Sequence, residues 1–157
     1  MRKIACFLLF LSTLIMLLSS CGERRSARDS LSELSAALGG GGVIYTADAN
    51  EGEAGYIDGE FFSLMFGEGF SFSGDYAVWL NSNLGKVCEA GIFVCESSYS
   101  AEQAKEMLRE RMRLVGSVIS SSSIDAPEGG LWEYGNTVVY YIGDGCERVG
   151  RMLQSIF

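Results

Sequence analysis

The chain has 157 residues, and its 20 acidic and 12 basic side chains give a formal net charge of −8. This acidic balance argues against binding of nucleic acid, or of an anionic lipid surface, through the charge of the protein itself. The sequence contains no histidine, which excludes Ser–His and Cys–His catalysis, imidazole zinc sites and histidine pH switches.

The N-terminal segment has the features of a lipoprotein signal peptide. Arg2 and Lys3 precede an apolar run over residues 4–18, which is shorter than the roughly 20 residues of a membrane-spanning helix. The run ends in a lipobox, a recognition motif for lipid attachment, formed by Leu18, Ser19, Ser20 and Cys21. The pattern predicts cleavage after Ser20 and a diacylglyceryl anchor on Cys21. An ordinary signal peptide and an uncleaved N-terminal anchor are the alternatives.

The predicted anchor holds the protein on the extracytoplasmic face of the cell membrane, with the lipid on Cys21 as its membrane contact. We therefore expect a signal peptide over residues 1–20, a lipidated tether over 21–29 and a single domain over 30–157. A domain of this length buries enough apolar surface to fold without disulfides or a metal ion.

Apolar periodicity and turn residues predict the secondary structure along the chain. Helices are expected over residues 31–38, 60–66, 100–119 and 147–157. Strands are expected over residues 76–81, 88–95, 131–134 and 137–142. Ser100 is the expected N-cap of the third helix, and Gly135 and Asn136 form the expected tight turn between the last two strands. This order favours an α+β fold in two layers, a four-stranded antiparallel sheet packed against helices on one face.

The segment after the first expected helix is rich in glycine and acidic residues. Glycines 39–42 lack the GK[ST] of a phosphate loop and are interpreted as a flexible joint. Counted from Asp48 as position 1 of an EF-hand loop, Glu53 replaces the required glycine and Gly59 replaces the bidentate acid. We therefore expect a solvated acidic loop here, and no metal ion or cofactor.

Three cysteines remain for the domain, because Cys6 lies in the signal peptide and Cys21 is the predicted lipidation site. These are Cys88, Cys95 and Cys146. An odd number allows one disulfide with a free thiol, or three buried thiols in a reducing habitat, and the sequence leaves both open. Their spacing does not form the CxxC of a redox motif.

Several short segments of the second half together resemble a known family. They cover residues 90–95, 100–105, 108–111, 135–136 and 138–142. Over residues 60–157 the chain resembles small lipoproteins of Gram-positive anaerobes with a domain of unknown function, catalogued under the number 4358. The resemblance implies a lipobox start, a Gly–Asn turn and a short C-terminal helix, and it implies no activity. The glycine-rich front half and the three domain cysteines depart from that family.

The common catalytic templates are absent, so we predict a protein that is not an enzyme. The serine-rich segment over residues 117–123 contains neither SxxK nor GxSxG. The first hypothesis is a membrane-anchored, non-catalytic interaction module for a protein, a peptide or an envelope component, with Trp79 and Trp132 as candidate surface contacts. Core positions are the alternative for these two aromatics. The alternative function is a small-solute-binding lipoprotein that hands its ligand to a transporter.

Overall fold

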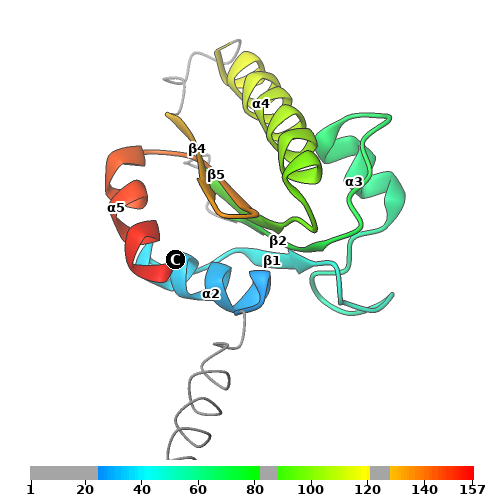
Figure 1. Cartoon of the computed structure of the whole chain (residues 1–157), viewed down its shortest axis with the longest axis horizontal. Helices are drawn as coiled ribbons and strands as arrows, with labels where there is room; N and C mark the ends of the chain where they lie inside the picture. Colours follow the sequence, from blue (N-terminus) through cyan, green and yellow to red (C-terminus); the bar gives the residue numbers. More distant parts are fainter. Residues whose placement is uncertain (1–24, 82–87, 121–127) are drawn as a thin grey trace, which may run out of the picture.

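In the computed structural model, the described residues are 25–81, 88–120 and 128–157. Figure 1 shows the helices and strands that they form. In chain order these are α2 (Ala27–Ala37), β1 (Val43–Thr46), α3 (Gly59–Phe66), β2 (Asp75–Leu80), β3 (Glu89–Val94), α4 (Ser98–Ser120), β4 (Gly129–Tyr134), β5 (Thr137–Ile142) and α5 (Cys146–Ile156). The lipobox residues 18–21 lie outside the described residues, so cleavage and lipidation stay predictions.

The five strands among the described residues form one sheet in the order β1-β2-β3-β5-β4, and each neighbouring pair is antiparallel. The α+β class is confirmed, but the expected number of four strands is wrong because β1 was not predicted. β1 has only four residues, too few for a clear alternating pattern. It is a strand because it pairs with β2, from Val43 opposite Leu80 to Thr46 opposite Ala77.

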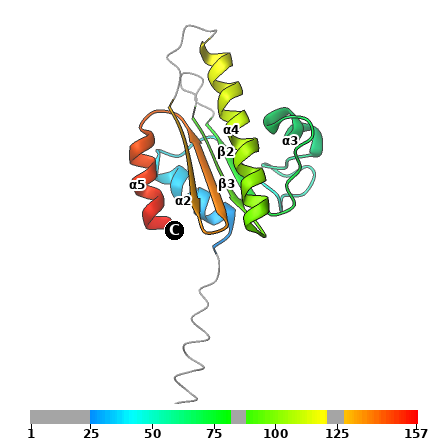
Figure 2. The same ribbon diagram turned by 45° about the horizontal axis from the view of Figure 1, so that its top comes forward.

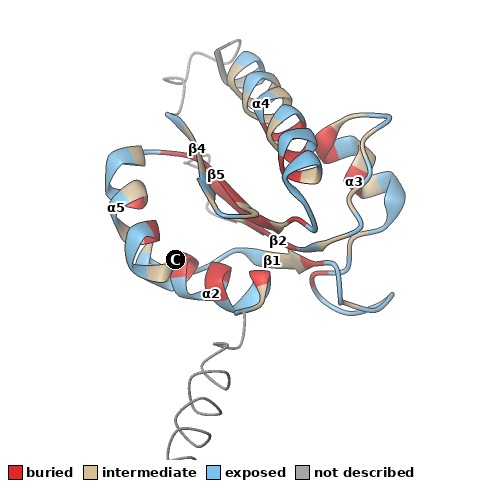
Figure 3. Cartoon of the chain, in the orientation of Figure 1, coloured by how far each residue is buried: buried red, intermediate tan, exposed pale blue. Residues whose placement is uncertain are grey.

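Helices cover both faces of the sheet, as Figure 2 shows. Helices α3 and α4 pack on one face, called the α4 face below, and helices α2 and α5 pack on the other, called the α2 face. The prediction of helices on one face is therefore wrong, and the domain has three layers instead of two. In Figure 3 the buried residues line the sheet and the helix surfaces turned toward it.

The strand β5 shows why a second helical layer is required. Val138 and Tyr140 are buried on the α4 face, whereas Val139 and Tyr141 are buried on the α2 face. A strand with one solvated face alternates apolar and polar residues, but a strand buried on both faces is a continuous apolar run. Because β5 is such a run, its exposure on either face would leave several large side chains in water.

The first described helix begins earlier than expected. Ser26 is its N-cap and accepts a hydrogen bond from the Asp29 backbone N–H. The Ala27 backbone N–H donates to Oδ2 of Asp75 at 2.8 Å, and Ala27 is fully buried. Residues 27–29, expected as the end of the tether, therefore form the first turn of α2 and are part of the domain.

Two other local predictions have different outcomes. Gly135, with φ of 60°, and Asn136 form the two-residue turn between β4 and β5, as expected. The expected N-cap of the long helix is wrong, because Ser97 and not Ser100 precedes its first turn. The Ser97 backbone N–H donates to the Ser100 hydroxyl and the Ser100 backbone N–H donates to the Ser97 hydroxyl, which is a reciprocal capping box.

Within the part of the chain that the structure describes, none of the helices has both the length and the hydrophobicity that are needed to cross a bilayer.

Candidate functional site

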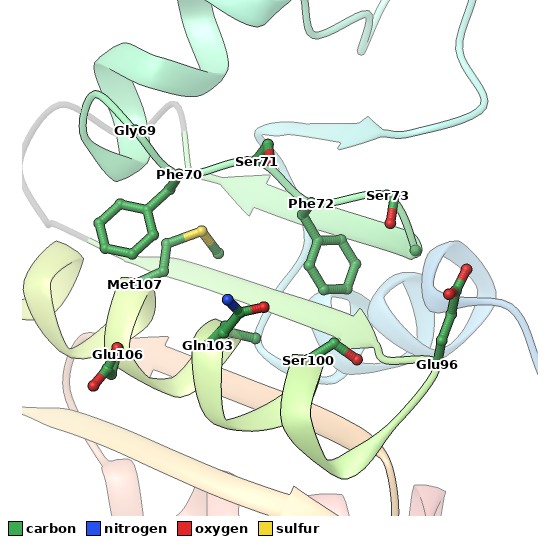
Figure 4. Close-up of a pocket in the computed structure, with 12 residues that line it drawn as sticks. Gly69, Phe70, Ser71, Phe72, Ser73, Glu96, Ser100, Gln103, Glu106 and Met107 are labelled. Carbon is green, nitrogen blue, oxygen red and sulfur yellow. The ribbon is translucent and has the colours of Figure 1, made fainter.

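A groove lies between the first turns of α4 and the segment that precedes β2 (Figure 4). Its cavity has a volume of about 260 Å³. One wall is the segment 69–74 between α3 and β2, and the other is the surface of α4 with the residue that leads into it. We call it the α4 groove; its residues outside segment 69–74 are Glu96, Ser100, Gln103, Ala104, Glu106 and Met107.

The wall formed by segment 69–74 is held by alternating aromatic side chains. Phe70 and Phe72 are half-buried and pack against the core, whereas Ser71 and Ser73 are exposed. The Phe72 ring meets the Phe93 ring edge-on, with centroids 5.1 Å apart, a geometry that stabilises aromatic pairs. The segment therefore presents serine hydroxyls to solvent on a fixed backbone.

Gly74 ends this wall where the chain passes close to β3. A Cβ atom at this position would lie 2.4 Å from the Val94 carbonyl oxygen, a distance that real Cβ atoms essentially never show. The missing side chain lets segment 69–74 enter β2 directly beside β3.

The wall formed by α4 combines an apolar base with polar side chains. Ala104 and Met107 are buried at the base, and Ser100 and Gln103 lie nearer the opening. Gln103 donates from Nε2 to the Tyr99 hydroxyl at 3.3 Å. Its amide oxygen accepts no hydrogen bond from any described residue, so it is available to a ligand.

The α4 groove is negatively charged at both ends. Glu96 and Glu106 lie at its opposite ends in Figure 4, and none of the groove residues is basic. Neither carboxylate forms an ion pair within the described part of the chain, whereas Glu102 and Glu133 nearby both contact Lys105 at 2.6 Å. A cationic ligand would therefore meet two carboxylates that have no competing cation.

A second polar cluster lies in the interior of the α4 face, at Glu89, Arg111 and Tyr140. Arg111 binds Glu89 with two hydrogen bonds of 2.9 and 2.7 Å, and the Tyr140 hydroxyl donates to Glu89 at 2.6 Å. A third nitrogen of Arg111 donates to the Met65 carbonyl oxygen at the end of α3. These contacts join α3, α4 and the sheet, and Glu89 itself is only 4% exposed. Burial raises the pKa of Tyr140 well above its usual value, and the Glu89 charge adds to this shift.

The two tryptophans predicted as surface contacts lie in different environments. Trp79 is 1% exposed and its indole N–H donates to the Gly41 carbonyl oxygen at 2.6 Å, so its prediction as a surface contact is wrong. Its side chain points to the core under α2 because both faces of β2 are covered. Trp132 is half-buried beneath α5, where its indole lies close to Gly150. Neither residue is part of the α4 groove.

None of the three domain cysteines, all within the described residues, forms a disulfide in this structure. Cys95 is buried on the α4 face, whereas Cys88 and Cys146 are half-buried on the α2 face. The sheet thus separates Cys95 from the other two, which excludes a disulfide to it in this fold. Burial raises the pKa of the Cys95 and Cys146 thiols, and the Cys88 thiol donates to the Tyr141 hydroxyl at 3.6 Å.

The described residues contain no group of three or more Cys, Asp and Glu side chains that could hold a metal ion.

In the acidic loop around residues 48–59, Glu53 accepts hydrogen bonds from the backbone and side chain of Asn50. These local hydrogen bonds lower the pKa of Glu53. The carboxylate therefore stabilises the turn itself.

Comparison with protein-family models, with curated proteins and with solved structures finds no match to this chain. The function of the domain is therefore inferred from its geometry. The sequence-based prediction missed the α4 groove, although the Phe–Ser–Phe–Ser alternation over residues 70–73, between glycines, was visible as a signal for an extended wall.

Proposed function

We propose that this chain is a membrane-anchored extracytoplasmic lipoprotein that acts as a non-catalytic interaction module. The α4 groove binds a short, extended, positively charged segment of a partner protein. The observation that carries this proposal is the pair Glu96 and Glu106, two exposed carboxylates without ion-pair partners among the described residues, at the ends of a groove that no basic side chain lines.

The length of the groove fits a peptide rather than a single ion. On α4 the groove residues run from Ser100 to Met107, a separation of seven residues that corresponds to about 10 Å along the helix axis. An extended chain rises about 3.3 Å per residue, so the groove spans about three residues of a bound segment. The serine hydroxyls and the Gln103 amide oxygen supply hydrogen bonds between the two carboxylates.

The alternative, a small-solute-binding lipoprotein, has weaker support. The groove volume of about 260 Å³ lies below the roughly 300 to 1,000 Å³ of pockets that enclose a drug-sized ligand. An open acidic groove supports contact with a partner that covers it better than enclosure of a solute.

The membrane anchor is tested by a Cys21→Ala variant of the full chain. We expect it to lose incorporation of radiolabelled fatty acid and to leave the membrane fraction, because the lipid is attached to this sulfur. Unchanged fractionation would contradict the lipobox and favour an uncleaved apolar anchor.

The groove is tested with a fluorescent tetralysine peptide as the probe. We expect a Glu96→Gln, Glu106→Gln double variant to bind it roughly tenfold more weakly in fluorescence anisotropy, since each exposed ion pair contributes up to about 1 kcal/mol. The matched control is a Glu51→Gln, Glu147→Gln double variant, which loses the same charge at exposed positions outside the groove. An equal loss of affinity in both double variants, or no binding to the unmodified protein, would refute the groove as the site.

A further inference from the structure

One end of the domain combines the start of the first described helix with exposed aromatic side chains. The Ala27 backbone N–H donates to Asp75, the first residue of β2. Asp75 pairs with Val94, and Val94 pairs with Thr137. This row of residues therefore marks the end of the sheet at which α2 begins, called the tether end below.

Two further segments reach the tether end. The turn between β4 and β5 lies there because Thr137 is the first residue of β5, and the Tyr134 ring just before the turn stacks on the Phe157 ring at 5.0 Å. Helix α4 starts four residues after Val94. Figure 2 shows the starts of α2 and α4, the hairpin turn and the C-terminal end of the chain at the same end of the domain.

Two of the large apolar residues exposed to solvent lie at the tether end. Tyr99, in the first turn of α4, is 72% exposed, and Phe157 is 45% exposed. They come from opposite faces of the sheet, since α4 and α5 cover different faces. The tether end thus presents aromatic side chains on both sides of the point where α2 begins.

The length of the tether limits which part of the domain stays near the lipid. Five residues lie between Cys21 and Ala27, and the chain from one to the other spans at most about 21 Å in any conformation. Helix α4 has 23 residues and is about 34 Å long. An anchor on Cys21 therefore holds the tether end close to the bilayer surface, whereas the far end of α4 extends beyond the reach of the tether.

We propose that the tether end docks on the bilayer that carries the anchor, with Tyr99 and Phe157 in the headgroup region. This inference rests on the proposed lipidation of Cys21. Tyrosine favours the membrane–water interface because it combines an apolar ring with a polar hydroxyl. An exposed phenylalanine ring adds apolar area that the boundary between headgroups and acyl chains buries. The lipid anchor supplies the affinity, and the aromatic contacts set the orientation, with α4 directed away from the membrane.

The test compares two positions on one helix. Tyr99→Trp and Val118→Trp each add a tryptophan at a highly exposed site, 72% and 67% exposed respectively, about 28 Å apart along α4. The full lipidated chain is placed in vesicles of phosphatidylcholine with brominated acyl chains, which quench tryptophan fluorescence at short range. The fluorescence of the unmodified protein is subtracted, since Trp79 and Trp132 remain.

We expect the bromolipid to remove most of the fluorescence added at position 99 and to leave that added at position 118. Flotation of the vesicles is measured first. A protein that does not float overturns the lipid anchor, and with it the docking. A protein that floats with both tryptophans quenched, or with neither quenched, overturns the docking alone. If Tyr99→Trp does not keep the circular dichroism of the folded protein, Phe157→Trp takes its place.

Discussion

The two faces of the sheet are each covered by two helices, but their chemistry differs. The α4 face is aromatic, with rings of α3, β2, β3 and β5 in mutual contact at centroid distances from 4.8 to 6.4 Å. It also holds the buried ion pair of Glu89 and Arg111. The α2 face is mainly aliphatic, and Leu31, Leu34, Val149 and Leu153 of its two helices are fully buried.

This difference places the proposed binding groove on one face and leaves the other face to packing alone. The acidic α4 groove lies where α4 meets an aromatic wall on one face of the domain. The α2 face excludes water from the opposite side of the same strands. A buried charge needs a matched partner from another element, whereas aliphatic side chains pack with any surface of the right shape. The stability of the α4 face therefore depends on particular residue pairs such as Glu89 and Arg111. The stability of the α2 face depends on how well the volumes of its side chains fill the space between helices and sheet.

The largest effect is expected at the buried ion pair. Glu89→Ala leaves the Arg111 guanidinium, whose side chain is only 19% exposed, without its carboxylate. Loss of one partner of a buried pair costs about 3–5 kcal/mol, to be measured as the free energy of unfolding in urea. A Glu89→Leu, Arg111→Met double variant is the control and should lose less than the single variant, because no unpaired charge is left. A cost below about 1 kcal/mol for Glu89→Ala, typical of exposed pairs, would contradict this role.

The next effect tests whether α2 covers the second face. Leu34→Ala removes a fully buried side chain and is expected to lower the free energy of unfolding by about 2–5 kcal/mol. The matched control is Leu64→Ala on α3, which removes the same atoms from a side chain that is 74% exposed. That variant should stay within about 0.5 kcal/mol of the unmodified protein. Equal effects of the two variants would mean that α2 does not pack on the sheet.

Alkaline pH should weaken both faces through their central tyrosines. Burial raises the pKa of Tyr140 on the α4 face and of Tyr141 on the α2 face. The folded protein then holds these protons to a higher pH than the unfolded chain. Their contribution to stability is present below the unfolded value of about 10 and decreases as pH rises above it, by up to about 1.4 kcal/mol per group and pH unit.

The measurement is the urea midpoint at about pH 8 and about pH 11, on either side of the unfolded tyrosine value. Tyr140→Phe and Tyr141→Phe should each make the midpoint less dependent on pH. Each substitution removes a hydroxyl that ionises in the unfolded chain and stays protonated in the folded protein. A midpoint of the unmodified protein that does not fall at the higher pH would refute the expected burial of these hydroxyls.

The smallest effect concerns reactivity and not stability. Cys95 is 1% exposed on the α4 face, and Cys146 is half-buried on the α2 face. We expect iodoacetamide to modify Cys146 slowly in the folded protein and Cys95 only in urea, as read by mass spectrometry. A Cys95→Ser variant should show the same labelling of the folded protein as the unmodified chain. Equal labelling rates of Cys95 and Cys146 in the folded state would place both thiols on an open surface and contradict the fold.

Local chemistry made several elements predictable. The apolar stripe of α4 is set by side chains three and four residues apart, and the β4–β5 turn needs a residue such as Gly135 with positive φ. β1 was not predictable in this way, because its four residues become a strand only through their pairing with β2. The α4 groove was not predictable either, since its walls are segments more than 20 residues apart in the chain.

The sequence by itself determined the charge and the lack of histidine, and it predicted the lipobox and most helices and strands. The tertiary structure alone decided that the sheet is covered on both faces, that Trp79 is a core residue, and that Glu89 meets Arg111. The physical reason is that periodicity within a segment reports which side chains avoid water. Which other segment covers them depends on packing between distant parts of the chain.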